Sequence, residues 1–376
     1  MTVASIVVTG ATRTDARTKD LVKRLRVGEV AVIDHKDLDR VAAETLAESG
    51  IVAVINASES SSGRYPNEGP VIVLEAGIAL LDGVGADIMD RFDDGTVVTI
   101  HGDEVLIDDE VVATGVRQSL ESIAEIHDRS RATLGAEFIR FVENTVEYFD
   151  HNRDLVSDDL EVPDVGISFE GRHVLMVVRG HDYREDLLLL RNTGYVNEQR
   201  PILIGVDGGA DALVEMGMPP DIIVGDFDSV SESALRGGAK LVVHAFPNGR
   251  APGAERLDEL GLDYFTFKAS GTSEDIAMLM AFNQGASLIV AVGTHSSMVD
   301  FLDKGRSGMA STILTRMKVG PILVDAKGVN RLYHSAVRKR DLMLLVAGAL
   351  AAIIIIVIVS DPIRLVIHSI WADLTG

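Results

Sequence analysis

The 376-residue chain contains no cysteine. This absence excludes disulfide bonds, zinc sites built on thiolates and catalytic cysteine nucleophiles. Basic residues are also scarce, with 35 lysines and arginines against 57 aspartates and glutamates and a formal net charge of −22. A protein this acidic repels the phosphates of nucleic acids, so we expect no nucleic-acid partner.

The N-terminus lacks the basic region and continuous apolar stretch of a secretory signal peptide. The longest apolar run lies near the C-terminus, at residues 342–359. As a helix it would be about 27 Å long and apolar on all sides, which favours a single transmembrane helix over a buried core helix. Arg338, Lys339 and Arg340 precede this run and only Arg364 follows it. The positive-inside rule therefore predicts a single-pass protein of the inner (plasma) membrane, with its bulk in the cytoplasm.

The apolar pattern predicts an α/β protein with four regions. They are an N-terminal small α/β or β-rich domain (1–116), a connecting helix and linker (117–165), a second α/β domain (166–337), and a basic flank with the transmembrane helix and a short outer tail (338–376). In the first domain, the loop "NASESSSGRYPNEGP" (56–70) has two interpretations. It is either a solvated connection or a binding loop for a phosphate or sugar, through its backbone amides, Arg64 and Tyr65.

Apolar and aromatic side chains recur every three or four residues along the predicted connecting helix. The stripe consists of Leu134, Phe138, Phe141, Val142, Thr145, Tyr148 and Phe149. Packing on a neighbouring domain and a two-fold dimer contact both explain it. We expect a homodimer that uses this helix.

From residue 172 to residue 335, nearly continuous apolar strands alternate with helix-compatible segments. This rhythm predicts a doubly wound parallel sheet covered by helices on both faces. Ligands of such sheets bind beyond the carboxyl ends of the strands.

Glycines, carboxylates and cations collect after the predicted strands. The candidate ligand-binding residues are Arg179, Gly180, Asp207, Gly208, Gly209, Asp226, Asp228, Ser229, Thr272, Ser273, Asp275, His295, Lys304 and Arg306. Asp207, Asp226 and Asp228 are the candidate Mg²⁺ ligands, because carboxylates beside a phosphate need a cation between them. The alternative is helix capping by Asp228 or Ser229 and by Thr272 or Ser273.

Two motifs in this region, "VDGGADAL" and "PDIIVGDFDSV", resemble the catalytic domain of thiamine pyrophosphokinases. The resemblance implies that these aspartates hold magnesium while a diphosphate passes from ATP to thiamine. Other family features differ: Ser273 follows Thr272 where the family has aspartate, Asp275 stands in the place of a glutamate, and the family's Gly-Gly-Arg motif and thiamine-binding domain are missing. We therefore expect no thiamine pyrophosphokinase activity.

Four further segments, "GRYPN", "VVRGHDYREDL", "GTSEDIAMLMA" and "FLDKGRSGMASTILTRMKVG", resemble the SteA-type cytokinetic-ring proteins of actinobacteria. This resemblance implies a place at the division septum, a SteB-type membrane partner and a role in cell separation. It identifies no reaction.

The combined prediction is a membrane-anchored division protein whose pyrophosphokinase-like domain binds a phosphate-containing ligand or serves as a dimeric scaffold. Two alternatives stay open. One is an active magnesium-dependent diphosphotransferase that acts on an unknown acceptor. The other is a switch in which a bound nucleotide controls partner docking. The predicted cofactor is Mg²⁺ with a nucleotide or diphosphate.

Overall fold

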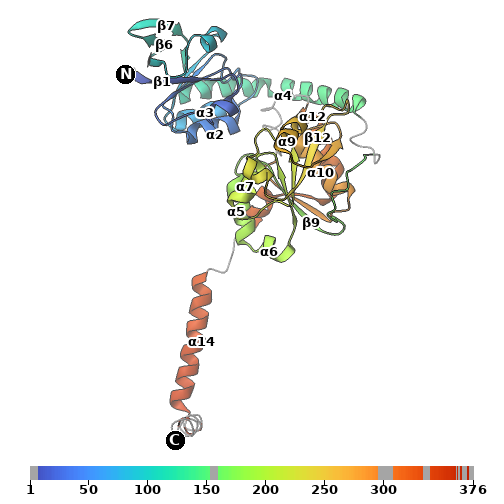
Figure 1. Ribbon diagram of the computed structural model, residues 1–376. Coiled ribbons are helices and arrows are strands. Elements are labelled where there is room, and N and C mark those ends of the chain that lie inside the picture. The colour runs from blue at the N-terminus through green and yellow to red at the C-terminus, as the bar shows by residue number, and fades with distance from the viewer. Residues whose placement is uncertain are drawn as a thin grey trace. The chain divides into compact units, whose positions relative to one another are not determined.

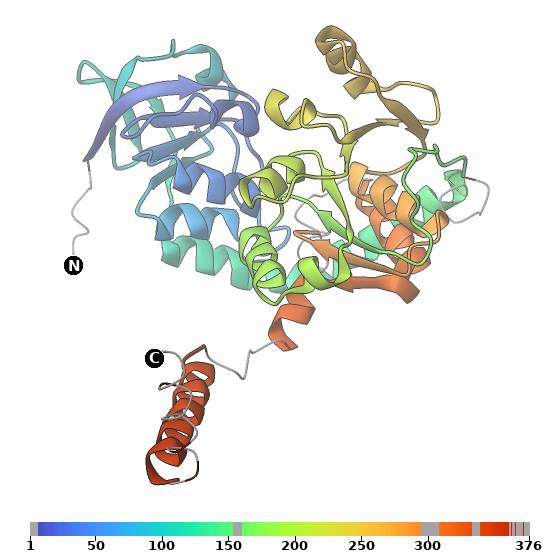
Figure 2. The ribbon, with the colours of Figure 1, turned by 60° about the horizontal axis from the view of Figure 1, so that its bottom comes forward.

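The computed structural model describes residues 7–152, 160–294, 308–332 and 339–360, together with Pro362, Leu365 and Trp371. Residues 1–327 belong to one compact unit and residues 328–376 to a second. Two separate sheets lie within the first unit (Figures 1 and 2). The predicted division of this unit into domains at residues 116 and 166 stays a prediction.

The first sheet has eight strands in the order β7-β6-β5-β1-β2-β3-β4-β8. Its strands are β1 (Val7–Thr14), β2 (Val30–Ile33), β3 (Ala53–Asn56), β4 (Ala79–Asp82), β5 (Val97–His101), β6 (Glu104–Ile107), β7 (Glu110–Thr114) and β8 (Val116–Arg117). Strands β1 to β4 are parallel, whereas β5, β6 and β7 form an antiparallel meander attached to β1. The sequence predicts either an α/β or a β-rich first domain. The domain contains both, a parallel α/β half and an antiparallel β-rich half.

The helical segments of this half are α1 (Thr18–Leu21), α2 (Arg40–Glu48), α3 (Gly69–Glu75) and the 3-10 helix η1 (Ala86–Asp90). The loop after β3 begins a buried hydrogen-bonded chain. Asn56 Nδ2 donates to Ser60 Oγ (2.8 Å), which in turn donates to Asp82 Oδ1 at the end of β4 (2.6 Å). Burial raises the pKa of Asp82 to about 6. Part of the 56–70 segment is thus structural, because it satisfies buried polar groups at the strand ends.

The predicted connecting helix is α4 (Leu120–His151), which begins with a capping box between Ser119 and Ser122. It contacts α3 in the first half of the unit and α12 in the second (Figure 1). The sequence stripe divides into two faces. Leu134, Phe141, Thr145 and Tyr148 are partly buried, and Tyr148 packs on the core of the second sheet. Phe138, Val142 and Phe149 are exposed, together with Ile139 and Val146.

The second sheet has seven parallel strands in the order β13-β12-β11-β10-β9-β14-β15. They are β9 (His173–Val177), β10 (Ile202–Val206), β11 (Ile222–Gly225), β12 (Lys240–Ala245), β13 (Phe265–Lys268), β14 (Leu288–Val292) and β15 (Leu323–Asp325). The helical segments are α5 (Tyr183–Asn192), α6 (Tyr195–Gln199), α7 (Gly209–Glu215), α8 (Glu232–Leu235), α9 (Pro252–Leu260), α10 (Ser273–Asn283), α12 (Gly308–Val319), η3 (Gly320–Ile322) and α13 (Ala326–Leu332).

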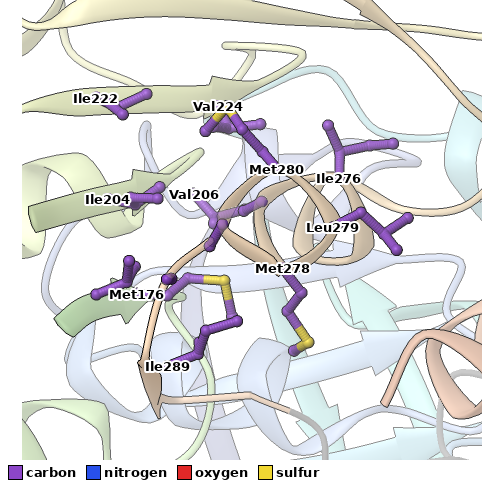
Figure 3. Packing of buried hydrophobic residues seen from close by; sticks show 14 of the residues in the cluster. Met176, Ile204, Val206, Ile222, Val224, Ile276, Met278, Leu279, Met280 and Ile289 are labelled. Atoms are coloured by element: carbon purple, nitrogen blue, oxygen red, sulfur yellow. The ribbon is translucent and has the colours of Figure 1, made fainter. Parts of the chain in front are cut away.

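Both faces of this sheet are buried, as the near-continuous apolar strands predict. Along β9, Val174 and Met176 pack on the side of α10, whereas Leu175 and Val177 pack on the side of α5 and α7. Helix α10 lies between the sheet and α12, so residues Ile276–Ala281 are buried all round. Figure 3 shows Ile204, Val206 and Ile222 of neighbouring strands packed toward this helix. The mixed α/β class with a parallel sheet is confirmed.

The second unit contains α14 (Lys339–Val359). Among the residues that the structure describes, no helix combines the length and the apolar character needed to cross a membrane. The predicted transmembrane helix at about 342–359, and the fold class that included it, are therefore wrong. Helix α14 begins with Lys339, Arg340 and Asp341, so charged residues form its first turn.

Candidate functional site

The candidate site lies at the carboxyl ends of β9, β10 and β11, which are neighbours in the second sheet. Arg179 and Gly180 follow β9, Asp207–Gly209 follow β10, and Asp226–Ser229 follow β11. Because these strands are parallel, their carboxyl ends meet at one edge of the sheet. We call these residues the strand-end site. His295, Lys304 and Arg306, also predicted to bind ligand, lie outside the described residues.

Asp207 organises the loop of the neighbouring strand. Its Oδ1 atom accepts the backbone N–H groups of Asp226 (2.9 Å) and Phe227 (3.1 Å). A Cβ atom at Gly225 would lie only 1.8 Å from the same oxygen, so glycine is required there. Asp226 Oδ1 in turn accepts the N–H of Asp228 (3.1 Å). The Gly225–Ser229 motif is therefore a turn held onto the carboxylate of the preceding strand end.

The electrostatics of Asp207 are unusual for an aspartate. Burial raises its pKa, and the negative charge of Asp226 raises it further, to about 7. Hydrogen bonds from the amide of Phe227, the hydroxyl of Ser273 and the amide of Asp226 partly oppose this effect. Ser273 begins α10, so this contact brings a fourth strand-end segment to the site. Asp207 and Asp226 form a carboxylate pair whose mutual repulsion these hydrogen bonds offset only in part.

Backbone strain marks the same three strand ends. Asp182, Asp207 and Phe227 have φ values of 59°, 45° and 60°. Positive φ is uncommon for residues with a Cβ atom and costs of order 1–3 kcal/mol. Its repetition at adjacent strand ends supports a functional interpretation, since strain of this kind clusters at ligand sites.

Arg179 lies over the backbone of the next strand end. A Cβ atom at Gly208 would come within 2.9 Å of Arg179 Cδ. The guanidinium contacts Glu215 at 3.5 Å through Nη2, whereas its buried Nε has no hydrogen-bond partner among the described residues. Gly208 N donates to Ser229 Oγ (3.1 Å), which joins two strand ends. The Nε of Arg179 is therefore a donor without an acceptor in the part of the chain that the structure describes.

The two remaining glycines of the site are required by close packing. A Cβ atom at Gly180 would lie 1.8 Å from the carbonyl oxygen of Gly293, and one at Gly209 would lie 1.9 Å from that of Val177. Each distance is far below van der Waals contact. These glycines allow the loops to pack against one another, whatever their relation to a ligand.

The capping alternative applies to Thr272 and Asp275. They form a reciprocal capping box at the start of α10, and Asp275 is fully buried. Ser311 Oγ donates to Asp275 Oδ2 at 2.5 Å, while burial raises the pKa of Asp275 to about 6. The cap of α8 is Ser231, so neither Asp228 nor Ser229 has that role. Asp228 and Ser229 instead line an open groove.

The groove has a volume of about 560 Å³. Its lining residues are Lys23, Arg179, Asp211, Val214, Glu215, Asp228, Ser229, Val230, Ser231, Ser233 and Arg256. The sequence predicted Arg179, Asp228 and Ser229. No sequence pattern predicted that Arg256 lines this groove, because it lies in an amphipathic helix, where arginine usually marks a solvated face. Lys23 comes from the other half of the unit, so no local pattern connects it with this site.

The predicted magnesium site depends on how the carboxylates at the strand ends are arranged. Among the described residues, no group of three or more histidine, aspartate or glutamate side chains has the arrangement of a metal site. One Asp207 oxygen already accepts two amides. The Asp207–Asp226 pair nevertheless fits the one or two carboxylates that Mg²⁺ uses when phosphate oxygens and water complete its shell. Magnesium thus fits as a complex with a phosphate ligand.

Two segments of the chain match known protein families. The thiamin pyrophosphokinase catalytic domain family matches residues 193–244, and the SteA-like C-terminal domain family matches residues 327–375. The first match contains Asp207, Asp226 and Asp228, and the second nearly coincides with the second compact unit.

One curated relative is the 6-hydroxymethyl-7,8-dihydropterin pyrophosphokinase of Methanocaldococcus jannaschii, 34% identical over 79 residues. That alignment covers 20% of this chain and 32% of the relative. The solved thiamine pyrophosphokinase of Bacillus subtilis is 21% identical, with a TM-score of 0.25, and the match covers 41% of this chain and 60% of that one. The chain thus spans less than two thirds of either protein. The two family matches confirm the resemblance read from the sequence: this is a SteA-like chain that carries a thiamine pyrophosphokinase-like domain.

Proposed function

We propose that this SteA-like protein acts in cell division, and that its pyrophosphokinase-like domain binds a phosphate-containing ligand together with Mg²⁺ at the strand-end site. The observation that carries the proposal is the position of Asp207 and Asp226 at adjacent strand ends, where Asp207 Oδ1 accepts the amide of Asp226. Burial and, after it, the charge of Asp226 raise the pKa of Asp207 to about 7. A cation removes the repulsion between these two carboxylates. When bound, Mg²⁺ would be held by this pair and would neutralise the phosphate charge.

The residues around the pair suit an anionic ligand. Arg179 has an unsatisfied Nε beside Gly208, and Ser229 lines the groove that begins at this edge. Guanidinium groups bind phosphates through charge-assisted hydrogen bonds, which are stronger than neutral ones. The ligand's phosphates would therefore lie between the carboxylate pair and Arg179.

Turnover is the alternative, and the name of the archaeal relative, a pyrophosphokinase, makes it relevant. Diphosphoryl transfer requires an acceptor hydroxyl held in line with the attacked phosphorus. Ser273 also stands where the thiamine pyrophosphokinases have a carboxylate, and here it donates to Asp207. We therefore favour binding without transfer to thiamine.

The test is a thermal-shift titration of the full-length chain with MgATP and with magnesium pyrophosphate. A ligand at 100 times its Kd stabilises the native state by about 2.7 kcal/mol. We expect Asp226→Asn with Asp228→Asn to abolish the shift. The matched control is Glu259→Gln with Asp263→Asn, two exposed carboxylates near the opposite edge of the sheet. A wild-type shift that survives the Asp226/Asp228 change would refute the site, and AMP release from ATP with thiamine would refute the absence of transfer.

The second candidate function is a dimeric scaffold, and the exposed apolar face of α4 favours it. Phe138, Ile139, Val142, Val146 and Phe149 are between 40% and 63% exposed. They lie on one side of the helix, about 100° from the face that packs on α12. A second copy related by a two-fold axis would bury the same face on both chains.

A further inference from the structure

Two lysines of the first domain lie at the ligand site of the second. Lys19 Nζ is 3.4 Å from Asp228 Oδ2, across 209 positions of sequence. Lys23 lines the groove with Arg179, Asp228 and Ser229. The two lysines are four residues apart, on α1 and the turn that continues it, so their side chains share one face. We propose that Lys19 and Lys23 bind the ligand's phosphates, which makes the strand-end site a composite of both domains. This inference rests on the proposed function.

The charges around the groove point to linked phosphates. Arg256 is already engaged, because it donates to the carbonyl oxygens of Phe227 and Val230. Within the described part of the chain, Lys19, Lys23 and Arg179 each have a single ion pair with a carboxylate, namely Asp228, Asp20 and Glu215. The groove also contains the carboxylates Asp211, Glu215 and Asp228. Cations and carboxylates thus occur together at this strand end, as a magnesium complex of a di- or triphosphate chain requires on its phosphate side and its metal side.

The ion pair between Lys19 and Asp228 indicates how such a ligand would bind. Both side chains are about half exposed, at 54% and 52%. A pair this exposed contributes little stability and opens easily. When the magnesium complex approaches Asp228, the lysine loses its carboxylate partner and gains a phosphate in its place. The ion pair of the free protein is thus exchanged for two contacts to the ligand.

Two further contacts between the two domains are also polar. His181 Nδ1 lies 2.9 Å from Glu44 Oε1, while Arg184 Nη1 lies 3.7 Å from Glu48 Oε1. Glu44 and Glu48 are successive positions on one face of α2. Charged, partly exposed contacts allow the domains to adjust their separation at small cost, in contrast to the apolar core beneath each sheet. A ligand held from both sides would therefore couple the two domains.

The experiment measures binding to the full-length chain by calorimetric titration, with MgATP and with magnesium triphosphate (inorganic) as separate probes. We expect Lys19→Gln with Lys23→Gln to weaken MgATP binding at least tenfold, because two charge-assisted contacts are lost. The control Lys240→Gln removes an exposed lysine at the opposite end of β12, and its affinity should equal that of the wild type. Equal losses for both probes identify the phosphate chain as the recognised group, whichever molecule supplies it.

A second measurement tests whether the ligand couples the two domains. Hydrogen exchange of the amides in residues 18–25 should slow when MgATP is added to the wild type, and not when it is added to the lysine variant. The proposal is overturned if the lysine variant binds MgATP as the wild type does, or if MgATP binds without protecting this segment. Failure of the proposed function looks different, since wild-type protein would then bind neither probe, and that result overturns both.

Discussion

Replacing Asp207 with asparagine tests the electrostatic description of the strand-end site. The carboxyl group has a pKa of about 7 in the folded protein against an ordinary value of 3.8. Asparagine keeps an Oδ1 that accepts the amides of Asp226 and Phe227, but it cannot ionise. The substitution therefore removes the cost of the negative charge while the turn stays in place.

The sign of the effect follows from proton linkage. Between pH 3.8 and about 7, the folded state retains the Asp207 proton and the unfolded state has released it. The free energy of unfolding of the wild type thus falls as the pH rises through this window. The difference between the two pKa values corresponds to a loss of about 4 kcal/mol in the free energy of unfolding of the wild type. Solvent screening of a partly buried group reduces this loss to about 2 kcal/mol. We expect Asp207→Asn to be about 2 kcal/mol more stable than the wild type at pH 8, with little difference at pH 4.

Urea unfolding followed by circular dichroism measures this difference at the two pH values. Fluorescence of the single tryptophan, Trp371, would report on the second compact unit instead. Asp82 and Asp275 also have raised pKa values, so the wild-type profile alone does not isolate Asp207. The control Asp263→Asn alters an exposed carboxylate and should leave the free energy of unfolding unchanged at both pH values. If Asp207→Asn is as stable as the wild type or less stable at pH 8, the charge of this carboxyl group is not a cost to the fold.

Two further predictions concern packing. Phe138→Asp with Val146→Asp should convert a dimer into a monomer by light scattering, with unchanged secondary structure, because charges would enter the apolar contact. The control Asn144→Asp adds a charge on another side of α4, and a variant that stays dimeric would exclude this face. Gly209→Ala should lower the free energy of unfolding by about 3 kcal/mol, because its Cβ would lie 1.9 Å from the oxygen of Val177. Gly320→Ala, where no atom lies within 4 Å, is the control, and equal unfolding free energies for the two variants would contradict the packing argument.

The amino-acid sequence was sufficient to predict the class of the second domain and the place of its candidate site. Apolar strands alternating with helices specify a parallel sheet buried on both faces, because hydrophobic periodicity is a property of neighbouring residues. The Asp-Gly-Gly and Gly-Asp-Phe-Asp-Ser motifs follow apolar strands, which was sufficient to place them at strand ends. The same local information misjudged residues 342–359, where apolar character was taken for a membrane span although charged residues occupy the first turn of α14.

The contacts of the individual side chains depend on the tertiary fold. Asp207 and Asp226 look equivalent in the sequence, yet the fold makes Asp207 an acceptor for the turn that contains Asp226. The stripe on α4 became two faces, because one side packs on α12 and the other does not. Lys19 meets Asp228 across 209 positions, and no periodicity encodes such a contact. Local patterns set the elements, whereas contacts between distant residues depend on how those elements pack.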